Sequence, residues 1–389
     1  METIALTISD ETLRDGEQQV GLYLDPATKQ ALAHLIAATG VHQIALMPAV
    51  HEMEAQLVKQ LAVQGLGLKL AASTMMSQAY IDQSQDCGVS QIILFHAVSD
   101  RLMFLRDPEL SAHPAYREKT ADNVSAADIQ AVRQRMLAAV LTHLRYAAER
   151  GLKVWFAAED ASRADFGFLV DCVNTFGPYL EQFLLCDTVG ALMPEKAYIW
   201  IHDLLACTDG TALSVHFHND RGLALENTIQ AVLAGASGIS GTFNGIGERS
   251  GNAPLEQVLN GLRLRFGWQV EGIDYKALDE VTRYMDQHSF RPNPPYSAQS
   301  RWCETGIHLS SMRRDRNSYA PFADGPPEVW FGKFSGASNF QYLFEQQLKR
   351  PLSRDRYEQL RVAVKQLAIQ EQRSFSVSEI LALIEQGLI

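Results

Sequence analysis

Cysteine is scarce in this sequence, and its cysteines are not arranged for pairing or for holding a metal. The five cysteines are scattered through 389 residues, and no two of them form a CxxC pair. An odd, dispersed set argues against a disulfide framework and against a structural zinc site. We expect all five to be reduced thiols.

Long apolar runs and an excess of positive charge are also missing. No segment offers the roughly 18 uninterrupted apolar residues that a membrane-spanning helix requires. The N-terminus lacks the cationic start and apolar run of a signal peptide. The chain has 34 Lys and Arg against 45 Asp and Glu, and its net charge of −11 repels a nucleic-acid backbone. We therefore expect a cytoplasmic protein that binds neither membranes nor nucleic acid.

Short β-branched, apolar segments alternate with longer amphipathic ones through the first two thirds of the chain. Eight βα units ending near residue 266 predict a closed (β/α)8 TIM barrel of the α/β class, which we place over residues 1–270. An open doubly wound sheet is the alternative, but GIGERSG at 245–251 has the wrong glycine spacing for its dinucleotide fingerprint. The predicted strands are TIALTIS, HQIALM, GLKLAAS, SQIILFH, KVWFAA, QFLLCD, ALSVHFH and SGISGTF.

The pattern changes after about residue 270. A proline-rich connector, RPNPPYS, occupies 291–297, and two amphipathic helices are predicted over 353–371 and 376–387. We expect residues 271–389 to form a C-terminal linker and α-rich helical subdomain that packs on a neighbouring surface.

The segment SVHFHND contains the most informative pair of side chains. His216 and His218 point to the same side of the predicted strand because strand residues alternate faces. Asp15 or Glu17, just past the first strand, could add a carboxylate and complete a site for a divalent ion. The alternative is that the histidines only form hydrogen bonds in the core. Polar residues at five strand ends favour a site, and these ends read DETLRDGEQ, EDASRAD, DTVG, HFHND and NGIGERSGN.

Other polar residues near these strand ends have simpler interpretations. Arg14 is a candidate for neutralising an oxyanion because it adjoins Asp15. Asp160 and Arg163 are expected to form an exposed pair at a helix start.

Together these loops resemble the acyl-CoA-condensing branch of the metal-dependent (β/α)8 family that includes isopropylmalate, homocitrate and citramalate synthases. DETLRDGEQ, EDASRAD, DTVG, HFHND and NGIGERSGNAPLE match in order, and ETGIH and FGKFSG match in the tail. The resemblance implies a Claisen-type condensation of acetyl-CoA, as co-substrate, with a 2-oxo acid to give a 2-substituted malate. It also implies a divalent metal, which would be Mg²⁺, Mn²⁺ or Zn²⁺.

The resemblance also implies roles for residues that bind the metal and the oxo acid. Asp15, His216 and His218 would be metal ligands, with Asn252 as the fourth. Arg14 and Thr188 would contact the 2-oxo acid, and Gln18 would lie close to it. Glu159 would help to orient the pocket.

The base that removes the acetyl proton is assigned in the same way. Glu248 and His308 would act together, with Tyr319 assisting. His308 would come from a partner subunit, so the resemblance implies a homodimer with exchanged C-terminal regions. Hydroxymethylglutaryl-CoA lyases resemble this barrel but carry a catalytic cysteine in the loop where this chain reads GIGERSGN. The missing cysteine favours synthesis over cleavage.

Departures from the family pattern indicate the substrate. Ala45 stands where a glutamate is usual, Met75 where an arginine is usual, and WFAAED places Trp155 and Ala157 where some homocitrate synthases have arginine and serine. We interpret Met75, Trp155 and Ala157 as substrate contacts that suit an apolar or aromatic side chain. Phenylpyruvate, giving 2-benzylmalate, is the specific prediction, followed by 2-oxoisovalerate, giving 2-isopropylmalate.

Three alternatives remain open at this point. EDASRAD and the compact length also resemble homocitrate synthases, which use 2-oxoglutarate. Cys303 and Phe334 replace usual histidines in the tail, which makes a catalytically inactive binding barrel the alternative from another class. A non-haem iron oxygenase could also use two histidines and a carboxylate, but such enzymes sit on antiparallel sheets.

Overall fold

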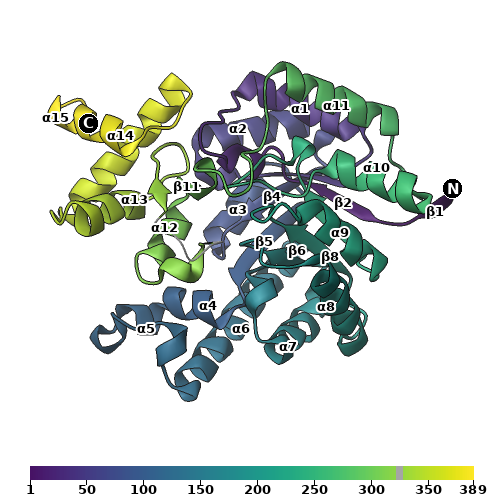
Figure 1. The fold of residues 1–389 in the computed structure, drawn as a ribbon, viewed down its shortest axis with the longest axis horizontal. Coiled ribbons are helices and arrows are strands. Elements are labelled where there is room, and N and C mark those ends of the chain that lie inside the picture. Colours follow the sequence, from purple (N-terminus) through teal and green to yellow (C-terminus); the bar gives the residue numbers. More distant parts are fainter. Residues whose placement is uncertain (321–326) are drawn as a thin grey trace.

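A closed barrel of eight parallel strands forms the centre of the computed structural model, which describes residues 1–320 and 327–389 (Figure 1). The strands follow one another in chain order, and the last pairs with the first. They are β2 (Thr7–Asp10), β3 (Gln43–Leu46), β4 (Leu70–Thr74), β5 (Gln91–Ala97), β6 (Lys153–Glu159), β7 (Gln182–Asp187), β8 (Leu213–Phe217) and β9 (Gly238–Gly241). The (β/α)8 barrel predicted from the alternation is confirmed.

Helices surround the barrel (Figure 1). The first, α1, begins with Pro26 at its first position, and the Asp25 side chain accepts the Thr28 N–H at 2.8 Å. The short helices α4 (Asp100–Arg106) and α5 (Pro108–Ala112) lie between β5 and α6. The eight longer helices around the barrel are α1 (Pro26–Ala38), α2 (Glu52–Leu61), α3 (Gln78–Asp86), α6 (Ala126–Glu149), α7 (Phe166–Phe176), α8 (Pro194–Cys207), α9 (Ala224–Leu233) and α10 (Leu255–Phe266).

Apolar side chains form two clusters because strand residues point alternately outward and inward. The larger cluster lies between the strands and the helices. On β6, Trp155, Ala157 and Glu159 share the inner face in that order, so Trp155 is the deepest of the three. The cluster inside the barrel consists of Ala45, Ala71, Ile93, Trp155, Ala157, Leu184 and Cys186.

The segment that follows the last barrel helix still packs against the barrel. β10 (Trp268–Val270) pairs with β1 (Glu2–Ile4), and α11 (Tyr275–Gln287) packs against α1. α11 therefore extends the outer helical layer past residue 270. The domain boundary predicted at residue 270 stays a prediction.

The tail contains a short two-stranded sheet and further helices. β11 (Trp302–Cys303) pairs with β12 (Glu328–Val329), α12 (Gly306–Met312) lies beside the barrel, and α13 (Ala337–Gln341) packs against α12 (Figure 1). The two helices predicted near the C-terminus are present as α14 (Arg354–Glu371) and α15 (Val377–Glu385). Within 1–320 and 327–389, no helix has the length and apolar character needed to cross a membrane.

Candidate active site

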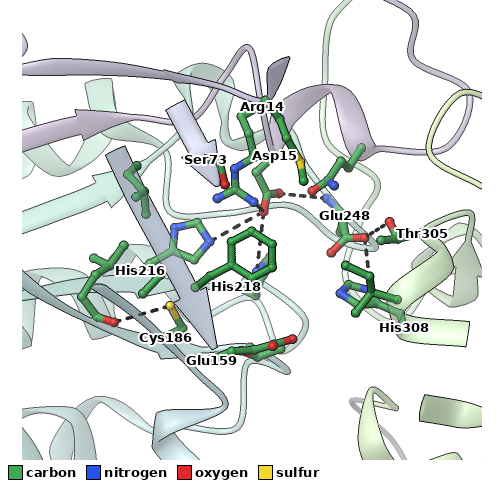
Figure 2. A pocket seen from close by; sticks show the side chains of 18 residues that line it. Arg14, Asp15, Ser73, Glu159, Cys186, His216, His218, Glu248, Thr305 and His308 are labelled. Carbon is green, nitrogen blue, oxygen red and sulfur yellow. Dashed lines mark hydrogen bonds and ion pairs between the residues drawn. The ribbon is translucent and has the colours of Figure 1, made fainter. Parts of the chain in front are cut away.

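A cavity opens at the carboxyl ends of the barrel strands, where the loops after the strands converge (Figure 2). The structure brings most of the predicted site residues together there. Those that line the cavity are Arg14, Asp15, Gln18, Ala157, Glu159, Thr188, His216, His218, Glu248 and His308. Asn252 and Tyr319 lie behind this lining, and Met75 and Trp155 do not reach it.

Asp15, His216 and His218 form a compact set of donor atoms. The Nε2 atoms of His216 and His218 lie 3.7 Å and 4.0 Å from Asp15 Oδ2. The two rings are 5.0 Å apart and nearly perpendicular, at 85°. Among the described residues this is the one group of three or more such side chains that could hold a metal ion.

The surroundings of these side chains fit a divalent cation. Burial opposes ionisation of Asp15, but Arg14 and the two imidazoles hold the pKa of its carboxyl well below 3.8. Burial also lowers the pKa of His218, which keeps that ring neutral and able to ligate. Asn252 is joined to His218 by a backbone bridge, and its buried Oδ1 has no hydrogen-bond partner. A buried oxygen without a partner is costly, and a cation would relieve that cost.

Arg14 is oriented from behind by a second carboxylate. Its Nε donates to Glu11 Oε2 at 2.6 Å, and its Nη1 donates to Asp15 Oδ2 at 3.0 Å. Glu17, the alternative carboxylate of the sequence analysis, lies elsewhere. It contacts Lys29 at 2.5 Å and Lys333 at 2.8 Å, so Asp15 is the carboxylate that faces the histidines.

Thr188 presents a free hydroxyl proton to the cavity. Its Oγ1 accepts the backbone N–H of Asp160 at 2.9 Å, which leaves the hydroxyl proton available for another acceptor. Asp160 itself is fully buried and bonds Ser99 and Arg163. The expectation of an exposed Asp160–Arg163 pair was therefore wrong: Asp160 lies under the loop, with a left-handed backbone that turns it inward.

Glu248 and His308 meet at one edge of the cavity (Figure 2). His308 Nδ1 lies 3.2 Å from Glu248 Oε1, and the Thr305 hydroxyl donates to the same oxygen. Burial raises the pKa of Glu248 to about 7 and lowers that of His308 to about 3. The family resemblance implies that His308 comes from a partner subunit, whereas in this structure the chain's own His308 occupies this place.

Glu159 is held by two residues behind the cavity wall. Arg106 donates to both of its carboxylate oxygens, and the Tyr319 hydroxyl donates to Oε1. Burial opposes ionisation of Glu159, but Arg106 outweighs it and holds the pKa at about 2. Sequence reasoning missed Arg106, because α4 carries no motif that distinguishes it from a surface arginine.

Apart from Ser73 and Thr305, the rest of the lining is apolar, and most of these apolar residues were also missed. Four of them form pairs two residues apart, Ile93 and Phe95 on β5 and Leu184 and Cys186 on β7, so strand alternation was the signal that could have found these four. Trp155 fails to reach the cavity because it lies two residues deeper than Ala157, and Ser73 of β4 lines the cavity where Met75 was expected. The apolar lining residues are Met47, Ile93, Phe95, Ala157, Leu184, Cys186 and Ile307.

Known proteins resemble this chain in sequence and in fold. It is 33% identical over 353 residues to the 2-isopropylmalate synthase of Sulfurisphaera tokodaii, covering 87% of this chain and 85% of that protein. It is 32% identical over 323 residues to the homocitrate synthase AksA of Methanothermobacter thermautotrophicus, covering 82% and 76%. In fold, it matches the crystal structure of the HMG-CoA lyase of Bacillus subtilis with a TM-score of 0.59 and 18% identity, over 76% of this chain and 98% of that one. A sequence model of the HMGL-like family matches residues 5–285, so the chain belongs to the HMGL-like family.

Proposed function

We propose that the protein condenses acetyl-CoA with a 2-oxo acid to give a 2-substituted malate and free CoA. Two kinds of observation support this: the synthases that the chain resembles, and a cavity that joins a metal-ligand set to an acid–imidazole pair. A divalent ion held by Asp15, His216 and His218, with Asn252 beside them, would supply Lewis-acid polarisation of the oxo acid carbonyl.

The protein's own groups can bind the carboxylate end of the oxo acid. Arg14 contributes positive charge in an orientation set by Glu11, and the Thr188 hydroxyl has a proton free to donate. Gln18 lines the same part of the cavity.

The Glu248–His308 pair is placed to accept the proton that leaves the acetyl methyl group. The resulting carbon nucleophile forms the new C–C bond to the oxo acid carbonyl carbon, whose oxygen takes a proton and becomes the product hydroxyl. Water then cleaves the thioester to a carboxylate and the CoA thiol. Because the methyl proton is weakly acidic, the base must act together with stabilisation of the developing enolate.

An apolar side chain on the oxo acid is the finer part of the proposal. Arg14 is the one Arg or Lys among the described residues that line the cavity, and the oxo acid's own carboxylate would already use it. A second carboxylate on the substrate would therefore find no free cation, whereas Ile93, Phe95 and Leu184 offer an apolar surface. We propose phenylpyruvate, giving 2-benzylmalate, or 2-oxoisovalerate, giving 2-isopropylmalate.

A thiol-release assay with acetyl-CoA, a divalent ion and a panel of 2-oxo acids tests the proposal. We expect kcat/KM for phenylpyruvate or 2-oxoisovalerate to exceed that for 2-oxoglutarate by at least about 100-fold, because the cavity lacks a partner for the distal carboxylate. A preference for 2-oxoglutarate would refute the apolar assignment and favour the homocitrate synthase alternative. Release with none of the acids would favour the inactive binding barrel, although Cys303 and Phe334, which motivate that alternative, do not line the cavity.

A further inference from the structure

Arg106, the last residue of α4, connects the barrel to the tail. One guanidinium nitrogen, Nη2, donates to Glu159 Oε1 at 3.1 Å and also to the Tyr319 hydroxyl, while Nη1 donates to the second oxygen of Glu159. Glu159 ends β6 and lines the cavity, whereas Tyr319 belongs to the tail. A single, partly buried guanidinium thus contacts both parts of the protein.

Tyr319 carries this connection on to the acid–imidazole pair. Its ring stacks on His308, with the ring centroids 3.8 Å apart and the planes inclined by 23°. His308 in turn lies 3.2 Å from Glu248. The contacts therefore run without a break from Arg106 through Tyr319 and His308 to Glu248.

We propose that Arg106 is a positioning residue that sets the placement of the tail on the barrel, so that His308 faces Glu248. The inference rests on the proposed function for its catalytic consequence. The Tyr319 hydroxyl makes both of its hydrogen bonds to barrel groups, accepting from Arg106 and donating to Glu159. Without Arg106, Glu159 is a partly buried carboxylate without its cation, and the Tyr319 hydroxyl loses one of its two hydrogen-bond partners.

The neighbouring Arg101 provides a matched control. It lies on the same helix, five residues earlier, and it contacts the same tail segment through Asp315. The exposed fractions of the two side chains are similar, 25% for Arg101 and 22% for Arg106. Arg101 forms its ion pairs with Asp122 and Asp315, and none of its hydrogen bonds or ion pairs among the described residues reaches Glu159 or Tyr319.

The test compares R106Q, R106K, R101Q, Y319F and the double variant R106Q/Y319F in the thiol-release assay. We expect R106Q to lower kcat by about 30- to 100-fold with little change in KM for the 2-oxo acid, because the base is misplaced while Arg14 and Thr188, which bind the oxo acid carboxylate, are unchanged. R106K, which keeps the charge but not the two-pronged geometry, should recover part of this loss. R101Q should stay within about threefold of wild type.

The double variant separates a shared effect from independent effects. If Arg106 acts through Tyr319, R106Q/Y319F loses about as much kcat as the more damaged single variant, whereas independent effects multiply. The proposal is overturned if R106Q keeps kcat within about threefold of wild type, if R101Q loses as much as R106Q, or if the losses multiply.

A second measurement does not depend on turnover. Amide hydrogen exchange across α12, which carries His308, should be at least about tenfold faster in R106Q than in R101Q. Equal exchange in the two variants would show that Arg106 is only one of several tail attachments and would overturn the proposal. Should wild type release no thiol with any 2-oxo acid, the proposed function fails, while the exchange rates still decide whether Arg106 places the tail.

Discussion

Asp15 uses its two carboxylate oxygens for different purposes. Oδ1 accepts hydrogen bonds from Asn252 Nδ2 at 2.7 Å and from the Glu248 N–H at 3.3 Å, which fixes the plane of the carboxylate. Oδ2 faces Arg14 and the Nε2 atoms of both histidines. One residue therefore joins the metal-ligand set to the group that would bind the oxo acid carboxylate.

Replacing Asp15 by Asn should weaken metal binding while preserving the size of the side chain. We expect the affinity of D15N for a divalent ion to fall by at least about 100-fold, because an amide oxygen lacks the charge that a hard cation requires. Elemental analysis after dialysis and competition with a chelating dye measure this directly. His34→Gln, on the exposed side of α1, is the control and should bind metal as wild type does. A full equivalent of metal in D15N would place the ion elsewhere.

Asp10, at the end of β2, should make stability depend on pH. It is completely buried, and burial raises its pKa to about 8 despite hydrogen bonds from the N–H and hydroxyl of Thr12. Because this pKa is higher in the folded than in the unfolded chain, the associated stability is full below about pH 4 and is lost as pH rises through about 8. Glu256, whose pKa burial raises to about 7, acts in the same direction.

Asp10→Asn should therefore flatten the pH dependence of Tm. Between pH 6 and pH 9 we expect the Tm of wild type to fall by about 5 °C more than that of D10N, as measured by scanning calorimetry. Glu256→Gln should remove the part of the fall in Tm that comes from the titration of Glu256. Parallel Tm curves for wild type and D10N would show that Asp10 does not titrate in this range.

At the scale of elements, four buried charges join the tail to the first two helices of the barrel. Lys333, in the tail, contacts Glu17 at 2.8 Å and Glu54 at 2.6 Å, and Lys29 of α1 contacts the same two carboxylates at 2.5 Å and 2.7 Å. Burial opposes ionisation of Glu54, but Lys29 and Lys333 outweigh it and hold the pKa at about 2. The two cations and two anions neutralise one another, so each depends on the others.

Removing one member of this cluster should be costly. We expect Lys333→Met to destabilise the protein by about 3–5 kcal/mol, because it leaves an excess of buried negative charge. Denaturant unfolding measures the change. Lys365→Met is the control from the same tail: Lys365 donates a hydrogen bond to the Val50 carbonyl at 3.0 Å, and its loss should cost only about 1 kcal/mol. Equal losses in the two variants would argue against a cooperative cluster.

At the scale of the whole molecule, the proposed active site needs His308 either from the same chain or from a partner subunit. The structure brings together the candidate metal ligands Asp15, His216 and His218, and His308, within one chain. The homodimer with exchanged C-terminal regions, implied by the family resemblance, stays a prediction.

Mixing two inactive variants distinguishes these arrangements. If each chain completes its own site, D15N mixed with His308→Ala should stay inactive after denaturation and refolding together, and this is the result that the structure favours. With exchanged tails, mixed dimers contain one intact site, and about a quarter of the wild-type activity should return. The mass of the native protein in solution tests the dimer separately.

Periodicity in the sequence determined the barrel and the common face of the two histidines, whereas the choice between Asp15 and Glu17 as their carboxylate neighbour was decided by the structure. Alternation along a strand depends only on neighbouring residues, so the common face of His216 and His218 could be read from the sequence, and parallel strands bring Asp15 to the same end. The partners of those residues were decided by tertiary structure. Glu159 could have paired with any of 34 basic residues, and only the packing of α4 and the tail against the barrel selects Arg106, 53 residues away, and Tyr319, 160 residues away. The same holds for the chain that supplies His308, because the docking of a tail arises from contacts between distant segments, which no local pattern records.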